Sequence, residues 1–145
     1  LTYSIPCLFG LEGLVGDELR RLSLQDVQVD NGRVLCRGEI SDLPRLNINL
    51  RCGERVLLQL GSFPARSFEA LFEGVRALPW EEFIPRDGQF PVKGYSLDSQ
   101  LHSVPDCQKI VKKAAARRLG QVYGLETLPE TGAKYQIQFA LHKDQ

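Results

Sequence analysis

The Asn31-Gly32 dipeptide, between two β-prone runs, restricts the fold of this chain more than any other feature. In "DVQVDNGRVLCRG" both residues tolerate the positive φ angles of a type I′ turn, so the sequence predicts a hairpin with a two-residue loop. That register places apolar residues opposite one another, so one face of the hairpin is expected to be apolar. The predicted cross-strand pairs are Asp30 with Arg33, Val29 with Val34, and Val27 with Cys36.

The segments on either side of the hairpin complete a β-α-β-β-α-β order. Helical spacing of apolar residues predicts amphipathic helices over 11–22 and 41–50, the second with Ser41 as N-cap and Pro44 in its first turn. With strands at 4–9 and 55–60, this order predicts a ferredoxin-like domain of the α+β class. The residues expected on the buried helix stripes are Leu11, Leu14, Val15, Leu19 and Leu22, then Leu43, Leu46 and Leu50.

A break in the pattern follows at "GSFPARS", whose glycine, proline and serine content is typical of a linker. The sequence predicts two domains, 1–64 and 65–145. In the second, the alternation of apolar residues in the predicted strand 89–97 changes phase at Lys93-Gly94, which predicts a β-bulge. The other elements expected there are helices at 67–78, 79–83 and 103–120 and a strand at 134–142, with Phe68, Leu71, Phe72 and Val75 buried on the first helix.

The helix predicted over 103–120 concentrates positive charge, although the whole chain has 18 basic and 18 acidic residues. Ser103 and Asp106 resemble a capping box at its start. A helical wheel places Cys107, Ile110, Val111, Ala114 and Val122 on the buried face. It places Lys109, Lys112 and Lys113 opposite them, Arg117 at the border and Arg118 near the apolar side. Two interpretations remain open: a solvated helix face, or a surface that neutralises phosphates.

Several kinds of chemistry lack a sequence signal. The chain has no glycine-rich nucleotide motif and no nucleophile elbow, so it is not expected to be an enzyme by itself or to carry catalytic residues. The four cysteines, Cys7, Cys36, Cys52 and Cys107, are dispersed, which favours buried thiols in a cytoplasmic protein over a metal site. No apolar run is long enough to span a membrane. Because methionine is absent, we expect a part of a longer protein.

Longer stretches of the chain resemble a known family. The opening "SIPCLFGLEGLVGDELRRL", then "NLRCGERVLLQLGSFPARSFEALFEGVRALPWEEFI" and "FPVKGYSLDSQLHSVPDCQKIVKKAAARRL", are similar to the N-terminal half of bacterial THUMP-domain RNA methyltransferases. The likeness is to the enzymes that methylate the guanine amino group of large-subunit rRNA. It implies a ferredoxin-like domain and a THUMP α/β domain that lacks its last strand. The S-adenosylmethionine-dependent catalytic domain would be missing, and with it the cofactor.

This resemblance implies an RNA-binding module that presents large-subunit rRNA to a catalytic domain. We include Lys112 and Arg118 because of their place on the helix, and Arg66 because of its place near the junction. Trp80 also matches the family, but a core position is expected for it. The residues implied in RNA binding are Arg51, Arg55, Arg66, Lys93, Gly94, Ser99, Lys109, Lys112, Lys113, Arg117 and Arg118. We expect Arg55, Arg66 and Lys93 to lie on the same side as the helix lysines.

Two other functions remain as alternatives. Ferredoxin-like folds often bind small regulatory molecules, so the fold alone does not exclude that role. A module that contacts proteins and only positions its neighbour is the other alternative.

Overall fold

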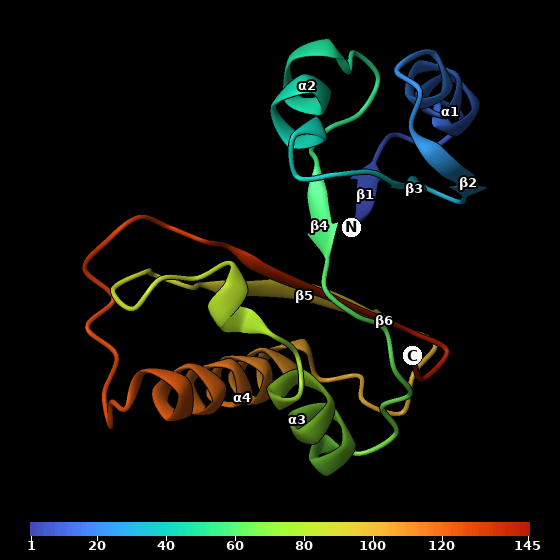
Figure 1. The fold of residues 1–145 in the computed structure, drawn as a ribbon. Helices are drawn as coiled ribbons and strands as arrows, with labels where there is room; N and C mark the ends of the chain where they lie inside the picture. The colour runs from blue at the N-terminus through green and yellow to red at the C-terminus, as the bar shows by residue number, and fades with distance from the viewer. The chain divides into compact units, whose positions relative to one another are not determined.

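The computed structural model describes residues 1–145, which form two compact units (Figure 1). The N-terminal unit is Leu1–Leu60 and the C-terminal unit is Gly61–Gln145. The division falls at the start of the segment 61–67 that the sequence predicts to be a linker.

The N-terminal unit is a four-stranded antiparallel sheet with two helices, in strand order β2-β3-β1-β4. This is the ferredoxin-like order, so the predicted fold of this half is confirmed. Its core contains side chains from the sheet and from both helices, including Ile5, Val15 and Leu46, which are fully buried. The elements are β1 (Thr2–Pro6), α1 (Glu12–Arg21), β2 (Gln25–Asp30), β3 (Arg33–Arg37), α2 (Asp42–Asn49) and β4 (Leu57–Gln59).

The hairpin β2–β3 follows the predicted register only near its turn. Asp30 pairs with Arg33 and Val29 with Val34, but the ladder is irregular between Gln25 and Gln28, so the predicted pairing of Val27 with Cys36 does not form. Asp26 in that stretch has a φ of 50°. The turn is also not type I′, because Gly32 has a positive φ of 77° while Asn31 does not.

Two details of the N-terminal helices differ from the prediction. Ser41 makes no side-chain cap; the Asp42 carboxylate instead accepts the amide of Glu39 at 2.8 Å. Leu14 is exposed, because the buried stripe of α1 is narrower and contains Val15 and Leu19.

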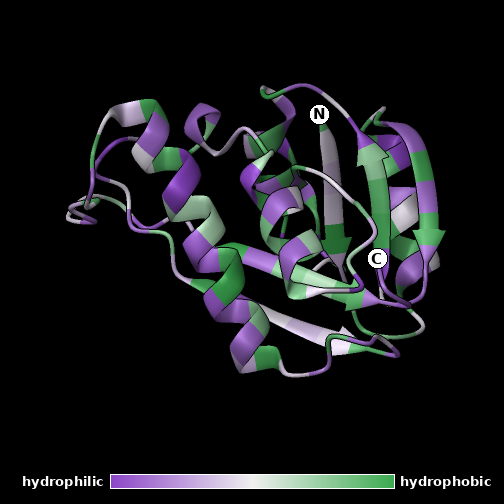
Figure 2. Ribbon diagram, turned by 90° about the horizontal axis from the view of Figure 1, so that it is seen from below, coloured by the Kyte–Doolittle hydropathy of each residue, from purple (hydrophilic) through white to green (hydrophobic).

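The C-terminal unit has two parallel strands, and α3 and α4 lie on one side of them (Figures 1 and 2). The predicted mixed α+β character of this half is confirmed, and its sheet has two strands. Along α4, hydrophilic and hydrophobic residues are interspersed, as expected for a helix with one buried face (Figure 2). The elements are α3 (Phe68–Arg76), the short 3-10 helix η1 (Trp80–Glu82), β5 (Val92–Leu97), α4 (Val104–Tyr123) and β6 (Ile137–His142).

The predicted bulge at Lys93-Gly94 is absent, because β5 pairs with β6 in one unbroken register from Val92 to Leu97. Phe90 belongs to the alternation of apolar residues before Lys93-Gly94. It lies before the strand and is buried. Tyr95 and Leu97, which set the second phase, are exposed on the other face. The apparent change of phase therefore reflects exposed apolar residues and not an extra residue in the strand.

Helix α4 runs three residues further than predicted and ends at Gly124, whose φ is 66°. Its buried residues are Cys107, Val111, Ala114, Ala115 and Leu119. Val122 is exposed, contrary to the helical-wheel prediction. The Ser103 hydroxyl donates to the Asp106 carboxylate at 2.6 Å and caps no backbone amide, so the predicted capping box does not form.

On α3, the predicted apolar stripe is only partly correct. Leu71 and Val75 are buried, but Phe68 is exposed at the first turn. Ser67 is the N-cap, and its hydroxyl accepts the amide of Ala70 at 3.1 Å.

Candidate nucleic-acid interface

Three cations on α4 form a row along its exposed face. Lys109, Lys113 and Arg117 are four residues apart, so they lie above one another at intervals of about 6 Å along the helix axis. All three are exposed, and none forms an ion pair in the structure. We call this row the α4 stripe. Its cations are free to bind phosphates without first leaving an acidic partner.

A shallow groove of about 430 Å³ runs beside the α4 stripe. Its lining is mostly apolar and includes side chains of three lysines of α4. Such a groove can accept a sugar or base edge while the cations contact the backbone. The groove is lined by Pro91, Val92, Gln108, Lys109, Lys112, Lys113 and Ala116.

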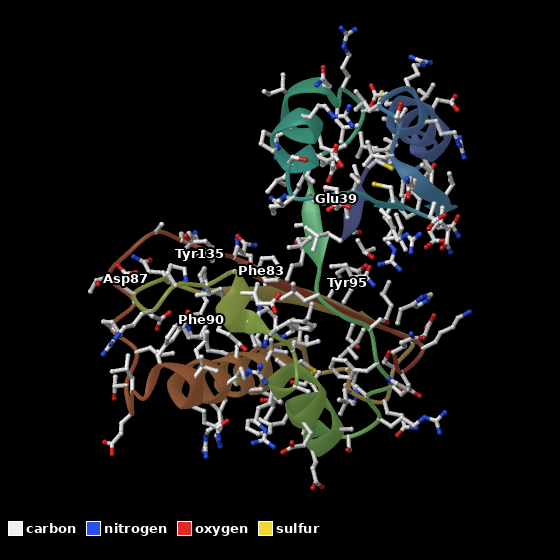
Figure 3. All side chains as sticks on the ribbon, in the orientation of Figure 1. Glu39, Phe83, Asp87, Phe90, Tyr95 and Tyr135 are labelled. Carbon is white, nitrogen blue, oxygen red and sulfur yellow. The ribbon has the colours of Figure 1, made fainter.

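Lys112 differs from its neighbours because it is already bound within the protein. Its Nζ donates to Glu130 Oε1 at 2.6 Å and to the Phe90 carbonyl at 3.0 Å, and it lies 3.6 Å from the centre of the Phe90 ring. Glu130 also accepts the Phe90 amide at 3.2 Å. This arrangement joins α4, the start of β5 and the loop before β6, so Lys112 has a structural role (Figure 3 labels Phe90).

The ionised form of Glu130 is favoured by these contacts. Burial by itself raises the pKa of this carboxyl, but the hydrogen bonds from Lys112 and from the Phe90 amide outweigh it, so the pKa is lowered overall. A group whose pKa is lower in the folded state stabilises the fold above its unfolded pKa. That stabilisation is lost as the pH falls through the folded pKa.

Replacing Lys112 with glutamine is expected to lower the stability of the C-terminal unit by about 1 kcal/mol at neutral pH. The value is modest because the Lys112 and Glu130 side chains are 37% and 35% exposed, and water replaces part of the interaction. Urea unfolding can be followed by the fluorescence of Trp80, the single tryptophan. The difference from the wild type should shrink as Glu130 is protonated in acid.

Lys113→Gln is the matched control for this prediction, since Lys113 is the adjacent lysine and has no partner. It should leave the urea midpoint unchanged. Equal midpoints for Lys112→Gln and the wild type would contradict the structural role of Lys112.

Arg118 is also bound within the protein. Its Nε donates to Glu81 Oε2 at 2.9 Å, and its Nη2 donates to the other carboxylate oxygen. This hydrogen bonding lowers the pKa of Glu81 and holds α4 against η1. Arg118 was predicted to lie near the apolar side of the helix, and its guanidinium is half-buried there in a bidentate ion pair.

The remaining predicted RNA-binding residues of the C-terminal unit lie elsewhere. Lys93 is exposed on the face of β5 opposite Val92, which lines the groove beside α4, so the prediction that Lys93 shares a side with the α4 lysines is wrong. Arg66 lies 3.8 Å from the Asp144 carboxylate. Ser99 fastens a turn, because its hydroxyl donates to the Leu97 carbonyl and accepts the Asp144 amide.

Gly94 has a packing role. A Cβ atom built on Gly94 would overlap the carbonyl oxygen of Phe139 on β6 and lie 2.5 Å from its ring. Glycine is therefore required for the close approach of the two strands.

Arg51 and Arg55 belong to the N-terminal unit. Both are exposed, and neither forms an ion pair. Their position relative to α4 stays a prediction.

Sequence reasoning missed Pro91 and Gln108, which line the groove, because no local pattern brings β5 and α4 together. The family resemblance implied Lys109, Lys113 and Arg117, but the helical wheel added Lys112 and Arg118, which are paired with acids. The four-residue spacing of Lys109, Lys113 and Arg117 was a signal that could have separated them.

The structure does not support a metal site, a reactive thiol at Cys36 or a membrane-spanning helix. No group of three or more histidine, cysteine or acidic side chains is placed to hold a metal ion. The four cysteines are free thiols, and burial followed by the nearby Asp42 charge raises the pKa of Cys36 to about 11, which makes this thiol unreactive. None of the helices is both long enough and apolar enough to cross a bilayer.

Family models match both halves of the chain. Residues 2–57 match the RlmL ferredoxin-like domain, and residues 65–145 match the THUMP domain. This chain belongs to the THUMP-domain family. The resemblance found in the sequence is thereby confirmed, and the THUMP half contains the α4 stripe.

Relatives of this THUMP protein are methyltransferases by name. "Putative RNA methyltransferase YpsC" of Bacillus subtilis is 44% identical over 138 residues, which are 94% of this chain and 36% of the relative. "Ribosomal RNA large subunit methyltransferase K/L" of Cellvibrio japonicus is 34% identical over 62% of this chain and 12% of its own length. The chain therefore spans about a third or less of the length of these relatives.

Solved structures show the same fold. One structure is described as "a predicted N6-adenine-specific DNA methylase from Listeria monocytogenes". It has a TM-score of 0.95 at 44% identity, and the match covers 99% of this chain and 38% of the solved chain. SMU.472, described as "a putative methyltransferase complexed with SAH", has a TM-score of 0.94 at 42% identity. The match covers 99% of this chain and 39% of the SMU.472 chain.

Proposed function

We propose that this chain is the RNA-binding part of an S-adenosylmethionine-dependent methyltransferase that modifies a guanine of large-subunit rRNA. The THUMP match and the names of the relatives support this function. The observation that carries it is the α4 stripe, whose three cations are exposed and unpaired beside a shallow groove. The chain would hold rRNA through its backbone and present it to a catalytic domain.

Catalysis and cofactor binding are proposed for a separate domain of the whole protein. YpsC is about three times as long as the part that this chain matches, and SMU.472 is described as complexed with SAH. The free thiols fit a reducing compartment, so we propose the cytoplasm as the location.

Removing the α4 stripe is expected to weaken the binding of every RNA. In the variant with Lys109, Lys113 and Arg117 all changed to glutamine, three phosphate contacts are lost while helix propensity stays high. The slope of log K against log salt should then become shallower by about 2, at ~0.7 per contact with a single strand. The wild-type affinity should lie in the non-specific range, about 10⁻⁴ to 10⁻⁶ M at physiological salt. Filter binding over a salt series measures both quantities.

A variant with the same loss of charge elsewhere is the control. Arg86, Lys134 and Lys143 are exposed cations without ion pairs, and changing all three to glutamine matches the change in net charge. This control should keep most of the salt slope. Equal slopes for the stripe variant and the wild type would show that RNA is not bound at α4.

A further inference from the structure

Phe9 is an exposed aromatic residue on a loop of the N-terminal unit. It lies between β1 and α1 and is 83% exposed, more than any other large apolar side chain of the chain. The adjacent Leu8 is also exposed. Neither contributes to the core of its unit, so the fold does not explain an aromatic residue at this position.

The loop that carries Phe9 is held by hydrogen bonds. The Glu12 carboxylate accepts the amide of Gly10 at 2.8 Å and that of Gly32 at 3.0 Å, and the Cys7 amide donates to the Gly32 carbonyl at 2.9 Å. Hydrogen bonds from the Glu12, Gly32 and Gly10 amides lower the pKa of the Glu12 carboxyl, so it is ionised and bound at neutral pH.

The Phe9 ring lies near the hairpin turn. A Cβ atom built on Gly32 would lie 3.5 Å from the edge of this ring. One edge of the ring therefore rests near the turn while most of its surface faces solvent.

Two arginines lie at the same end of the sheet. The loop that carries Arg51 and Arg55 is tied to the end of β1, because the Glu54 amide donates to the Pro6 carbonyl at 2.9 Å. The Glu18 carboxylate accepts the Arg51 amide and holds the other side of the loop.

The two arginines can bind an anion directly. Both guanidinium groups are exposed and without ion pairs. The nearby Glu12 and Glu18 carboxylates are bound by backbone amides, and Glu54 is the one acid between the two arginines in sequence. At the hairpin, Asp30 and Arg33 form an ion pair at 3.7 Å, so their charges cancel.

An exposed aromatic ring and free guanidinium groups at the same end of a sheet suit an unpaired nucleotide. Every base has a π-face that can stack on such a ring, and arginine binds the adjoining phosphates. A protein partner fits less well, since a stable interface buries about 800 Å² on each side, and only Leu8 and Phe9 are exposed apolar residues in this loop.

We propose that Phe9, Arg51 and Arg55 form a contact site on the N-terminal unit for an unpaired RNA nucleotide. The Phe9 ring stacks on the base, and the two arginines bind the phosphates on either side of it. This Phe9 site rests on the proposed function and extends it, because it selects RNA loops or bulges over continuous duplex.

The test uses the whole chain and two RNAs with the same stem. One is a hairpin with 2-aminopurine in its loop, and the other is a blunt duplex without a loop. Phe9→Ala should weaken binding to the hairpin by about 5- to 100-fold and leave binding to the duplex unchanged. Wild-type protein should quench the 2-aminopurine fluorescence on binding, and Phe9→Ala should not.

Three further variants separate stacking from apolar contact and from charge. Phe9→Trp should retain the affinity for the hairpin, whereas Phe9→Leu, which is apolar but has no ring, should lose it. Changing Arg51 and Arg55 together to glutamine should reduce the salt slope for the hairpin by about 1.4, at ~0.7 per contact. Because all three side chains are exposed, thermal unfolding of these variants should match the wild type.

Three results overturn the inference, and they are distinguishable. If wild-type chain binds both RNAs and Phe9→Ala binds them equally well, the Phe9 site is wrong while the proposed function stands. If wild-type chain binds neither RNA at low salt, both are wrong. A change of oligomeric state in Phe9→Ala without a change in RNA binding would assign the ring to a protein contact and would also overturn the Phe9 site.

Discussion

Replacing Trp80 with alanine should cost the C-terminal unit about 3 to 5 kcal/mol of stability. Trp80 is 7% exposed, and its Nε1 donates to the Val75 carbonyl at 2.8 Å. Removing the indole leaves a large cavity between η1 and its neighbours and takes away that donor. Urea unfolding followed by far-ultraviolet circular dichroism measures the loss without the tryptophan signal.

Two controls make this result specific. Trp80→Phe keeps most of the apolar volume and should lose less stability. Phe68→Ala removes an exposed aromatic side chain from α3 and should change stability by no more than about 0.5 kcal/mol. If Trp80→Ala kept the wild-type stability but lost RNA affinity, Trp80 would be a stacking residue and its core role would be wrong.

The order of the elements could be predicted because it depends on local signals. The helical period of α1 and the turn residues Asn31-Gly32 are each contained within one short segment. The pairs nearest the turn were correct for the same reason. The predicted register was wrong further from the turn, where Asp26 adopts a positive φ that no sequence pattern indicates.

The role of each cation on α4 could not be predicted from the helix alone. Lys112 and Arg118 are neutralised by Glu130 and Glu81, which lie 18 and 37 residues away in the sequence. A helical wheel describes only the neighbours within one helix, so it does not show which cations have an acidic partner elsewhere in the chain. Tertiary structure pairs two of them and leaves Lys109, Lys113 and Arg117 free for phosphates.

The exposed face of β5 shows a second limit of prediction from the sequence. Tyr95 and Leu97 are apolar but exposed, and the alternation that they form with Lys93 was interpreted as a change of phase (Figure 3 labels Tyr95). Apolar residues are common on protein surfaces, so alternation alone does not tell which face is buried. The buried face of the sheet is identified by the adjacent strand β6, whose Ile137 and Leu141 are buried.

Gly94→Ala is expected to destabilise the C-terminal unit by about 3 kcal/mol, although it adds a single methyl group. Gly94 pairs with Phe139 in the β5–β6 ladder, and the new methyl would overlap the Phe139 carbonyl oxygen. A backbone oxygen in a ladder does not rotate away as a side chain does, so the two strands would have to separate. Urea unfolding followed by Trp80 fluorescence measures the loss.

A glycine with open space provides the matched control. Gly13 lies inside α1 with no atom near its would-be methyl, so Gly13→Ala should leave stability unchanged or raise it by up to about 1 kcal/mol. Adding Phe139→Leu to Gly94→Ala removes the overlap with the ring but not with the carbonyl oxygen, so it should restore only part of the loss. If Gly94→Ala unfolded at the wild-type urea concentration while RNA affinity fell, Gly94 would contact RNA, as the family resemblance implies, and the packing role would be wrong.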